Sequence, residues 1–283
     1  MWRRSMQLAR QTVGAWTDDN APSMGAAIAY YTVFSIAPLL LIVMAVAGFV
    51  WGREAVQGEI ARQLSGLLGP EAARSVQALV QSADQPRTGA WAGSLSLVLL
   101  LVGATTVFAE LQSALDRIWK VHAVQRGGWW AMLRARLLSL GFVLGLGFLL
   151  AVSLVISAGL SAFGAWAQGR LPAYEAWLQL ANTAVSLAVA TLLFGLMFKL
   201  MPRVRLVWTD VWVGAVVTAV LFEAGKLLIG LYLCKSGVAS TYAAAGSVVV
   251  LLLWVYYSAQ IFLLGAEFTR LYAQAHGSQR PWG

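Results

Sequence analysis

The sequence has few charges, one cysteine and two histidines. Only 11% of its 283 residues are Asp, Glu, Lys or Arg; the cysteine is Cys234 and the histidines are His122 and His276. One cysteine excludes a disulfide framework or a cysteine metal cluster within a single chain. Two histidines this far apart form no ligand motif, so we expect no bound metal and no cofactor. Together with 59% hydrophobic residues, the low charge places the chain in the membrane class.

The apolar residues gather in long stretches. A helix needs roughly 17 to 25 predominantly apolar residues to cross a bilayer. The sequence predicts an all-α, polytopic membrane protein with six transmembrane helices, accompanied by amphipathic helices at the membrane interface. The expected spans lie at about residues 23–50, 91–108, 137–163, 177–200, 211–233 and 245–268.

Residues 23–272 are the expected transmembrane domain, between an N-terminal amphipathic arm at 1–22 and a cytoplasmic tail at 273–283. No removable signal peptide is expected, because the first apolar run is too long for one. The arm carries an apolar stripe at helical spacing: Trp2, Met6, Ala9, Val13 and Trp16. Two interpretations stay open: the arm lies in the membrane interface, or it packs against the protein itself.

The basic residues lie between the apolar spans, where they orient a membrane protein and do not suggest nucleic-acid binding. Six spans put both termini on one side. Thirteen Lys and Arg residues lie on that side, and six lie on the other. Because cytoplasmic loops are enriched in Lys and Arg, the count predicts cytoplasmic termini.

Several local features are also predicted. Asp18, Asp19 and Asn20 offer N-caps to the first span, and Pro38 is expected to kink it, with Ser35 satisfying the freed carbonyl. Two short amphipathic helices are expected within residues 51–90. The second span is expected to continue beyond the membrane through the segment LQSALDRIWKV.

Two charges fall inside a predicted span. Glu223 lies about 12 residues into the fifth span, and Lys226 follows one helical turn later. A charge at the bilayer centre costs about 3 kcal/mol, so such residues pair or line a wet path. One interpretation is a gate, or a site for a headgroup or ion. The other is a self-neutralising pair that joins the fifth helix to the sixth through Tyr256, Tyr257 or Gln260.

Other polar side chains in the first and sixth spans also need partners in hydrocarbon. Ordinary packing is the alternative for the tyrosines. With the charged pair, these residues make up the candidate substrate path: Tyr30, Tyr31, Glu223, Lys226, Tyr242, Tyr256, Tyr257, Gln260 and Glu267. No catalytic residues and no metal ligands are expected, because no nucleophile with a base and no paired carboxylates stand out.

Three segments in order, DNAPSMGAAIAYYTVFSIAPLLL, LQSALDRIWKV and the stretch from LFEAGKLLIG to AEFTRLYA, resemble the YihY/BrkB family of bacterial inner-membrane proteins. The resemblance covers nearly the whole chain and implies six helices with cytoplasmic termini. Members have carried a ribonuclease label, but this chain lacks the closely spaced His and Asp ligands of such an enzyme. Where relatives commonly read Tyr-Gly-Ala-Ala-Gly, this chain has Tyr242-Ala-Ala-Ala-Gly246.

The expected function is transport or flipping of a lipid or other amphiphile, with membrane lipids as partners. No GxxxxGK[ST] motif is present, so nucleotide would not drive it. The alternative is a membrane scaffold or envelope-integrity factor that transports nothing; an enzyme is not expected. The sequence does not determine the substrate or the oligomeric state.

Overall fold

The structure of the chain is a computed structural model. It describes residues 2–52, 54, 56–58, 60–61, 76–77, 80–81, 90–121, 141, 145, 174–204, 206–236 and 246–277. These residues form helices and short connections, with no strand among them. The all-α prediction is confirmed.

The six long helices among the described residues correspond to the arm and to five of the six predicted spans. Their bounds are α1 (Trp2–Asp18), α2 (Ala21–Trp51), α5 (Ala90–Ile118), α7 (Tyr174–Leu200), α8 (Trp208–Ser236) and α10 (Gly246–Ala275). At about 1.5 Å per residue, α2 with its 31 residues is about 46 Å long, more than the roughly 30 Å hydrocarbon core needs.

Among the described residues, four stretches are long and apolar enough to cross a membrane: Ala21–Ile42, Thr183–Leu200, Trp208–Lys226 and Val248–Ala275. They correspond to the first, fourth, fifth and sixth predicted spans. The second predicted span lies within α5, and nearly all of the third lies outside the described residues. Six spans therefore stay a prediction. As expected, the α5 helix continues past the second span as far as Ile118.

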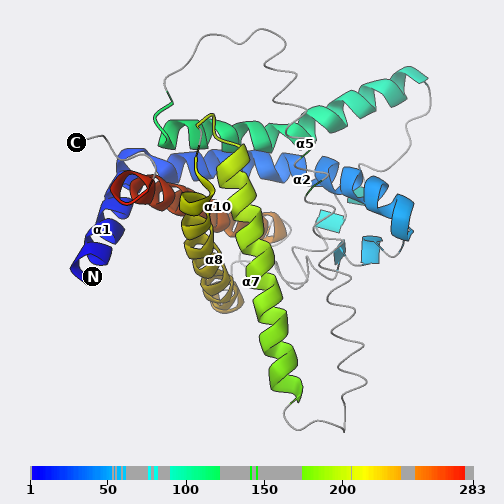
Figure 1. The fold of residues 1–283 in the computed structure, drawn as a ribbon. Helices are drawn as coiled ribbons and strands as arrows, with labels where there is room; N and C mark the ends of the chain where they lie inside the picture. Colours follow the sequence, from blue (N-terminus) through cyan, green and yellow to red (C-terminus); the bar gives the residue numbers. More distant parts are fainter. Residues whose placement is uncertain are drawn as a thin grey trace.

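The helices pack side by side in the order α5, α2, α10, α8, α7 (Figure 1). The N-terminal helix α1 lies against α10 and also contacts α2. Thr12 of α1 is buried, whereas Met6, Arg10 and Val13 are exposed. The arm therefore packs against the protein, as one interpretation expected. Contact of its exposed side with the membrane stays a prediction.

Helices α8 and α10 approach closely through two reciprocal pairs of glycine and threonine. A Cβ atom added at Gly214 of α8 would overlap Thr269 of α10, and one added at Gly265 of α10 would overlap Thr218 of α8. Each threonine hydroxyl donates to a carbonyl of its own helix at 2.7 Å, Thr218 to Gly214 and Thr269 to Gly265. Small residues that allow backbones to approach are typical of membrane helix interfaces.

Two local expectations about α2 are wrong. Asn20 precedes the helix with a φ of 59° and makes no side-chain cap hydrogen bond. The Ser35 hydroxyl is buried but finds no hydrogen-bond partner among the described residues, so it does not satisfy a carbonyl near Pro38. The Pro38 ring instead packs where Gly103 of α5 leaves room, since a Cβ at residue 103 would lie 3.0 Å from it. Proline and glycine together bring α2 and α5 close.

Five helix ends meet at one end of the molecule, where α2 and α8 begin and α5, α7 and α10 end. Just after α7, the Arg203 amide donates to Asp116 of α5 at 3.0 Å, and its Nε lies 3.5 Å from the same carboxylate. Gly277, just after α10, lies against Asp210 in the first turn of α8. The first of these helices, α2, thus begins at the end of the molecule where the last, α10, ends.

Candidate functional site

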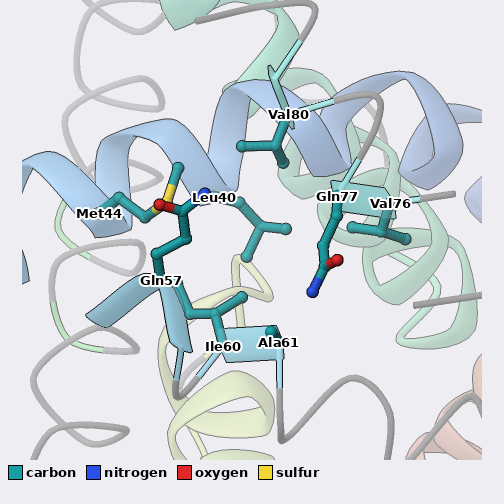
Figure 2. A pocket seen from close by; sticks show the side chains of 8 residues that line it. All are labelled: Leu40, Met44, Gln57, Ile60, Ala61, Val76, Gln77 and Val80. Carbon is teal, nitrogen blue, oxygen red and sulfur yellow. The ribbon is translucent and has the colours of Figure 1, made fainter. Parts of the chain in front are cut away.

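A small cavity lies beside α2, but it is too small for an amphiphile. Its volume is about 20 Å³, room for about one water molecule. Figure 2 shows Leu40 and Met44 of α2 on one side of it and the other labelled side chains, from Gln57 to Ala61 and from Val76 to Val80, on the others. Its lining is mostly apolar, with Gln57 and Gln77 as the polar members: Leu40, Met44, Gln57, Ile60, Ala61, Val76, Gln77 and Val80. The cavity is therefore not a candidate for the substrate path.

The intramembrane charges form an ion pair. Lys226 Nζ lies 2.7 Å from Glu223 Oε2, one turn away on α8. The Ser186 hydroxyl of α7 donates to Glu223 Oε1 at 2.8 Å, so both carboxylate oxygens have a partner. The Lys226 ammonium also lies 5.8 Å from the centre of the Phe222 ring. Pairing and hydrogen bonding reduce the cost of placing these charges in a bilayer.

This pair lies near the middle of α8 and is partly exposed. The Glu223 side chain is 24% exposed and that of Lys226 is 25% exposed. The polar contact beyond the pair goes to α7, so the expectation of a link to the sixth helix, α10, is wrong at this point. A partly exposed ion pair at this depth can meet a polar group that enters from the surface of the molecule.

The other predicted site residues lie in different interfaces. Gln260 of α10 donates to the Pro22 carbonyl of α2 at 3.4 Å and packs against Gly25. Its Oε1 atom is buried and has no hydrogen-bond partner among the described residues. Tyr257 of α10 packs against Gly225 of α8. Gln260 thus contacts α2 and Tyr257 contacts α8, so these two side chains of α10 lie in different helix interfaces.

The tyrosines of α2 behave differently from those of α10. Tyr30 is exposed, and its ring contacts Tyr31 edge-on at 5.5 Å and Phe34 at 4.9 Å, both in its own helix. Tyr256 packs beside the apolar core between α2 and α10. Tyr242 lies outside the described residues.

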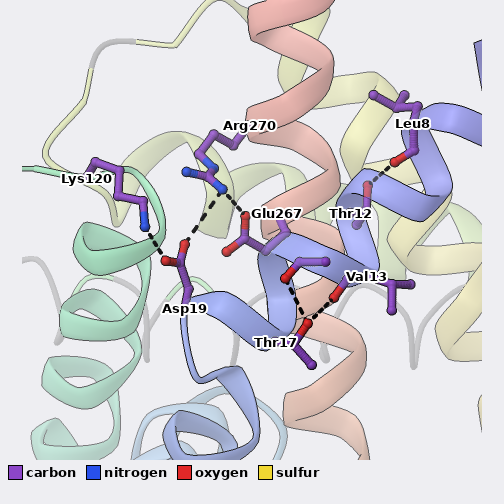
Figure 3. Close-up of polar contacts among 9 residues, drawn as sticks. Leu8, Thr12, Val13, Thr17, Asp19, Lys120, Glu267 and Arg270 are labelled. Carbon is purple, nitrogen blue, oxygen red and sulfur yellow. Dashed lines mark hydrogen bonds and ion pairs between the residues drawn. The ribbon is translucent and has the colours of Figure 1, made fainter.

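The last predicted site residue, Glu267, belongs to a buried ionic cluster that we name the polar junction: Asp19, Lys120, Glu267 and Arg270 (Figure 3). Arg270 Nη2 lies 2.7 Å from Glu267 Oε2 and 3.6 Å from Asp19 Oδ2. Lys120 pairs with Asp19 Oδ1. The junction joins the α1–α2 connection, the end of α5 and the end of α10.

Burial differs strongly between these side chains. Glu267 is fully buried, and Asp19 is only 8% exposed, whereas Lys120 is 56% exposed. Burial acts to raise the pKa of Asp19, but the ion pair with Lys120 and the charge of Arg270 outweigh it. The pKa of Asp19 therefore lies below its ordinary value of 3.8.

Sequence reasoning found Glu267 but missed its partners. Asp19 was expected to cap a helix, and neither Lys120 nor Arg270 was assigned a role. Lys120 lies just after α5 in the left-handed region, with a φ of 52°, and its side chain pairs with Asp19. The available signal was the i,i+3 spacing of Glu267 and Arg270 in an apolar helix, which indicates a buried ion pair.

No group of three or more His, Cys, Asp or Glu residues with metal-binding geometry occurs in the part of the chain that the structure describes.

Long apolar helices, an intramembrane ion pair and helix ends joined by ionic contacts define a multi-pass membrane protein. A family model described as virulence factor BrkB matches residues 12–282. The chain therefore belongs to the BrkB family of bacterial membrane proteins, as the resemblance implied. No solved structure matches it.

Curated relatives carry the name UPF0761 membrane protein. One from Pseudomonas aeruginosa is 32% identical over 264 residues, covering 92% of this chain and 61% of the relative. One from Azotobacter vinelandii is 29% identical, covering 88% of this chain and 59% of the relative, and one from Tolumonas auensis is 25% identical, covering 89% and 80%. The chain thus spans about three fifths of the length of the first of these relatives.

Proposed function

We propose that the protein moves a lipid or other amphiphile across the bacterial inner membrane, without nucleotide, and that both termini are cytoplasmic. The observation that carries the proposal is the ion pair of Glu223 and Lys226, which is partly exposed near the middle of a membrane helix. Neighbouring positive and negative groups complement a zwitterionic headgroup, in which a phosphate and an ammonium lie side by side. Such a site lowers the cost of bringing a headgroup into the hydrocarbon.

The structure favours a path along the α7 and α8 side of the molecule over one between α2, α8 and α10. Ser186 of α7 and the charges of α8 supply polar groups there. The interface of α8 with α10 is filled by Thr218 and Thr269 against glycines. A headgroup would need to separate these tightly packed backbones to pass between them.

A second candidate is a scaffold that transports nothing. The close packing of α8 on α10 favours it, because a sealed bundle suits a purely structural role. In that case the ion pair only joins α8 to α7. Transport and scaffolding predict different results for one experiment.

The experiment measures the scrambling of a fluorescent zwitterionic phospholipid in liposomes that contain the purified protein. Wild type is compared with Glu223→Gln/Lys226→Gln, which removes both charges and leaves none unpaired. The matched control is Asp116→Asn/Arg203→Gln, which removes an ion pair at the helix ends. We expect scrambling in wild type and in the control, and its loss in the variant of the intramembrane pair. Equal rates in all three proteins would contradict the proposed site, and rates equal to protein-free liposomes would favour the scaffold.

A further inference from the structure

The polar junction contains a carboxyl oxygen that has no donor although it is fully buried. Glu267 is 0% exposed, and its Oε2 atom accepts a hydrogen bond from Nη2 of Arg270 at 2.7 Å. Its Oε1 atom accepts no hydrogen bond from any described residue, and neither does Oδ2 of Asp19. Leaving a buried acceptor without a donor destabilises the folded protein, and more strongly when the group is charged.

These two oxygens belong to carboxyl groups that face each other. Figure 3 shows the free oxygen of Glu267 pointing toward Asp19. One nitrogen of Arg270, Nη2, lies 2.7 Å from Glu267 Oε2 and 3.6 Å from Asp19 Oδ2, which keeps the two carboxyl groups close together. Ionised carboxylates only accept, so two of them cannot form a hydrogen bond. A single proton placed between them gives both oxygens a partner.

We propose that the polar junction is a proton-binding site, in which Glu267 carries a proton and donates it to Asp19 in a hydrogen bond. The polar junction lies away from the proposed lipid path along α7 and α8. The proposal therefore does not rest on the proposed function. Its ligand is a single proton, and it links α10 to the α1–α2 connection.

The surroundings decide which carboxyl group holds the proton. Among the described residues, the charged groups that contact the pair are Lys120, just after α5, and Arg270 of α10. Lys120 pairs with Asp19, and Arg270 lies between the two acids. Asp19 thus has two cations and keeps its charge, while Glu267 has one and is completely buried. Asp19 is the acceptor of the shared proton, and Glu267 is its donor.

Loss of the proton changes what the junction does. Two ionised carboxylates that face each other repel, and burial amplifies the repulsion. Deprotonation therefore weakens the contact between α10 and the α1–α2 connection. Binding of one proton holds the N-terminal helix and its connection against the end of α10.

Infrared spectroscopy of the protein in liposomes tests the proposal directly. A protonated carboxyl group has a C=O stretch distinct from that of a carboxylate, and this band shifts in D₂O. At neutral pH we expect a buried carboxylic acid band in wild type that is lost in Glu267→Gln. The matched control is Glu223→Gln, which removes an ion-paired carboxylate and should keep the band. If the wild-type spectrum has no carboxylic acid band, or if Glu267→Gln keeps the band, the proposal is overturned.

A second measurement covers the case in which Glu267→Gln folds poorly. Asp19→Asn removes the charged acceptor of the proposed hydrogen bond while the Glu267 side chain remains. We expect this variant to keep the acid band but to shift it, because the partner of the acid has changed. A band at the wild-type position in Asp19→Asn would show that Glu267 does not share its proton with Asp19 and would overturn the assignment.

Discussion

Gly265 of α10 lies so close to Thr218 of α8 that a Cβ atom at residue 265 would overlap the threonine side chain. Because Thr218 is fully buried, it has no room to move aside. Added atoms in a packed interface cost about 1 to 3 kcal/mol. We therefore expect Gly265→Ala to lower the melting temperature of the protein in detergent.

The matched control for this substitution is Gly14→Ala. Gly14 lies in α1 with nothing within 4 Å of an added Cβ, and alanine favours a helix over glycine by roughly 1 kcal/mol. The control should keep or raise the melting temperature. If both variants behaved alike, the close approach of α8 and α10 would be wrong.

The Glu223–Lys226 pair predicts an order of stability among variants. Glu223→Gln leaves the ammonium of Lys226 unpaired inside the membrane, and Lys226→Gln leaves the carboxylate unpaired. Breaking a buried pair costs about 3 to 5 kcal/mol, but this pair is a quarter exposed, so we expect about 1 to 3 kcal/mol for each single variant. The double variant should lose less than either one. Chemical unfolding in detergent measures this order, and additive losses would show that the charges do not interact.

The contacts of Asp116 predict that Asp116→Asn and Asp116→Ala differ in stability. Asp116 Oδ1 accepts from the Arg203 amide at 3.0 Å, and its ion pair with the exposed Arg203 side chain is 3.5 Å long. Exposed pairs contribute about 0 to 1 kcal/mol. Asp116→Asn keeps an acceptor for the amide and should be nearly as stable as wild type. Asp116→Ala loses it and should be less stable by about 1 kcal/mol. Equal unfolding free energies for Asn and Ala would contradict the role of the amide contact.

Asp19 predicts a loss of stability in acid. Its pKa is lowered in the folded protein, so the folded state binds this proton less readily than the unfolded chain does. The stability that the Asp19 carboxylate contributes is complete above its pKa in the unfolded chain, near 3.8. It is lost as the pH falls through the lower pKa that Asp19 has in the folded protein. Melting temperatures measured from pH 6 downward should fall less steeply in Asp19→Asn. Parallel curves for the two proteins would contradict the contribution of Asp19.

The helices α2, α5, α7, α8 and α10 could be predicted from the sequence because each contains a long apolar run. The predicted stretch 177–200 became α7 (Tyr174–Leu200), and 211–233 became α8 (Trp208–Ser236). Hydrophobicity alone decides such segments, since every backbone polar group in a bilayer must be paired within the helix.

The partners of the polar residues could not be predicted, because they come from residues far apart in the chain. Ser186 and Glu223 are 37 positions apart, and Asp19 and Lys120 are 101 apart. Asp19 next to Asn20 resembles a helix cap, and only the packing of α1 on α10 brings it to Arg270. Periodicity shows which face of a helix is polar but not which other helix that face meets.

The initial rate of phospholipid scrambling in liposomes, with and without the wild-type protein, tests directly whether this protein moves lipid. If it does, the scrambling rate rises in proportion to the number of protein copies per liposome and needs no nucleotide. A rate equal to that of protein-free liposomes, with or without an ion gradient, would contradict lipid movement.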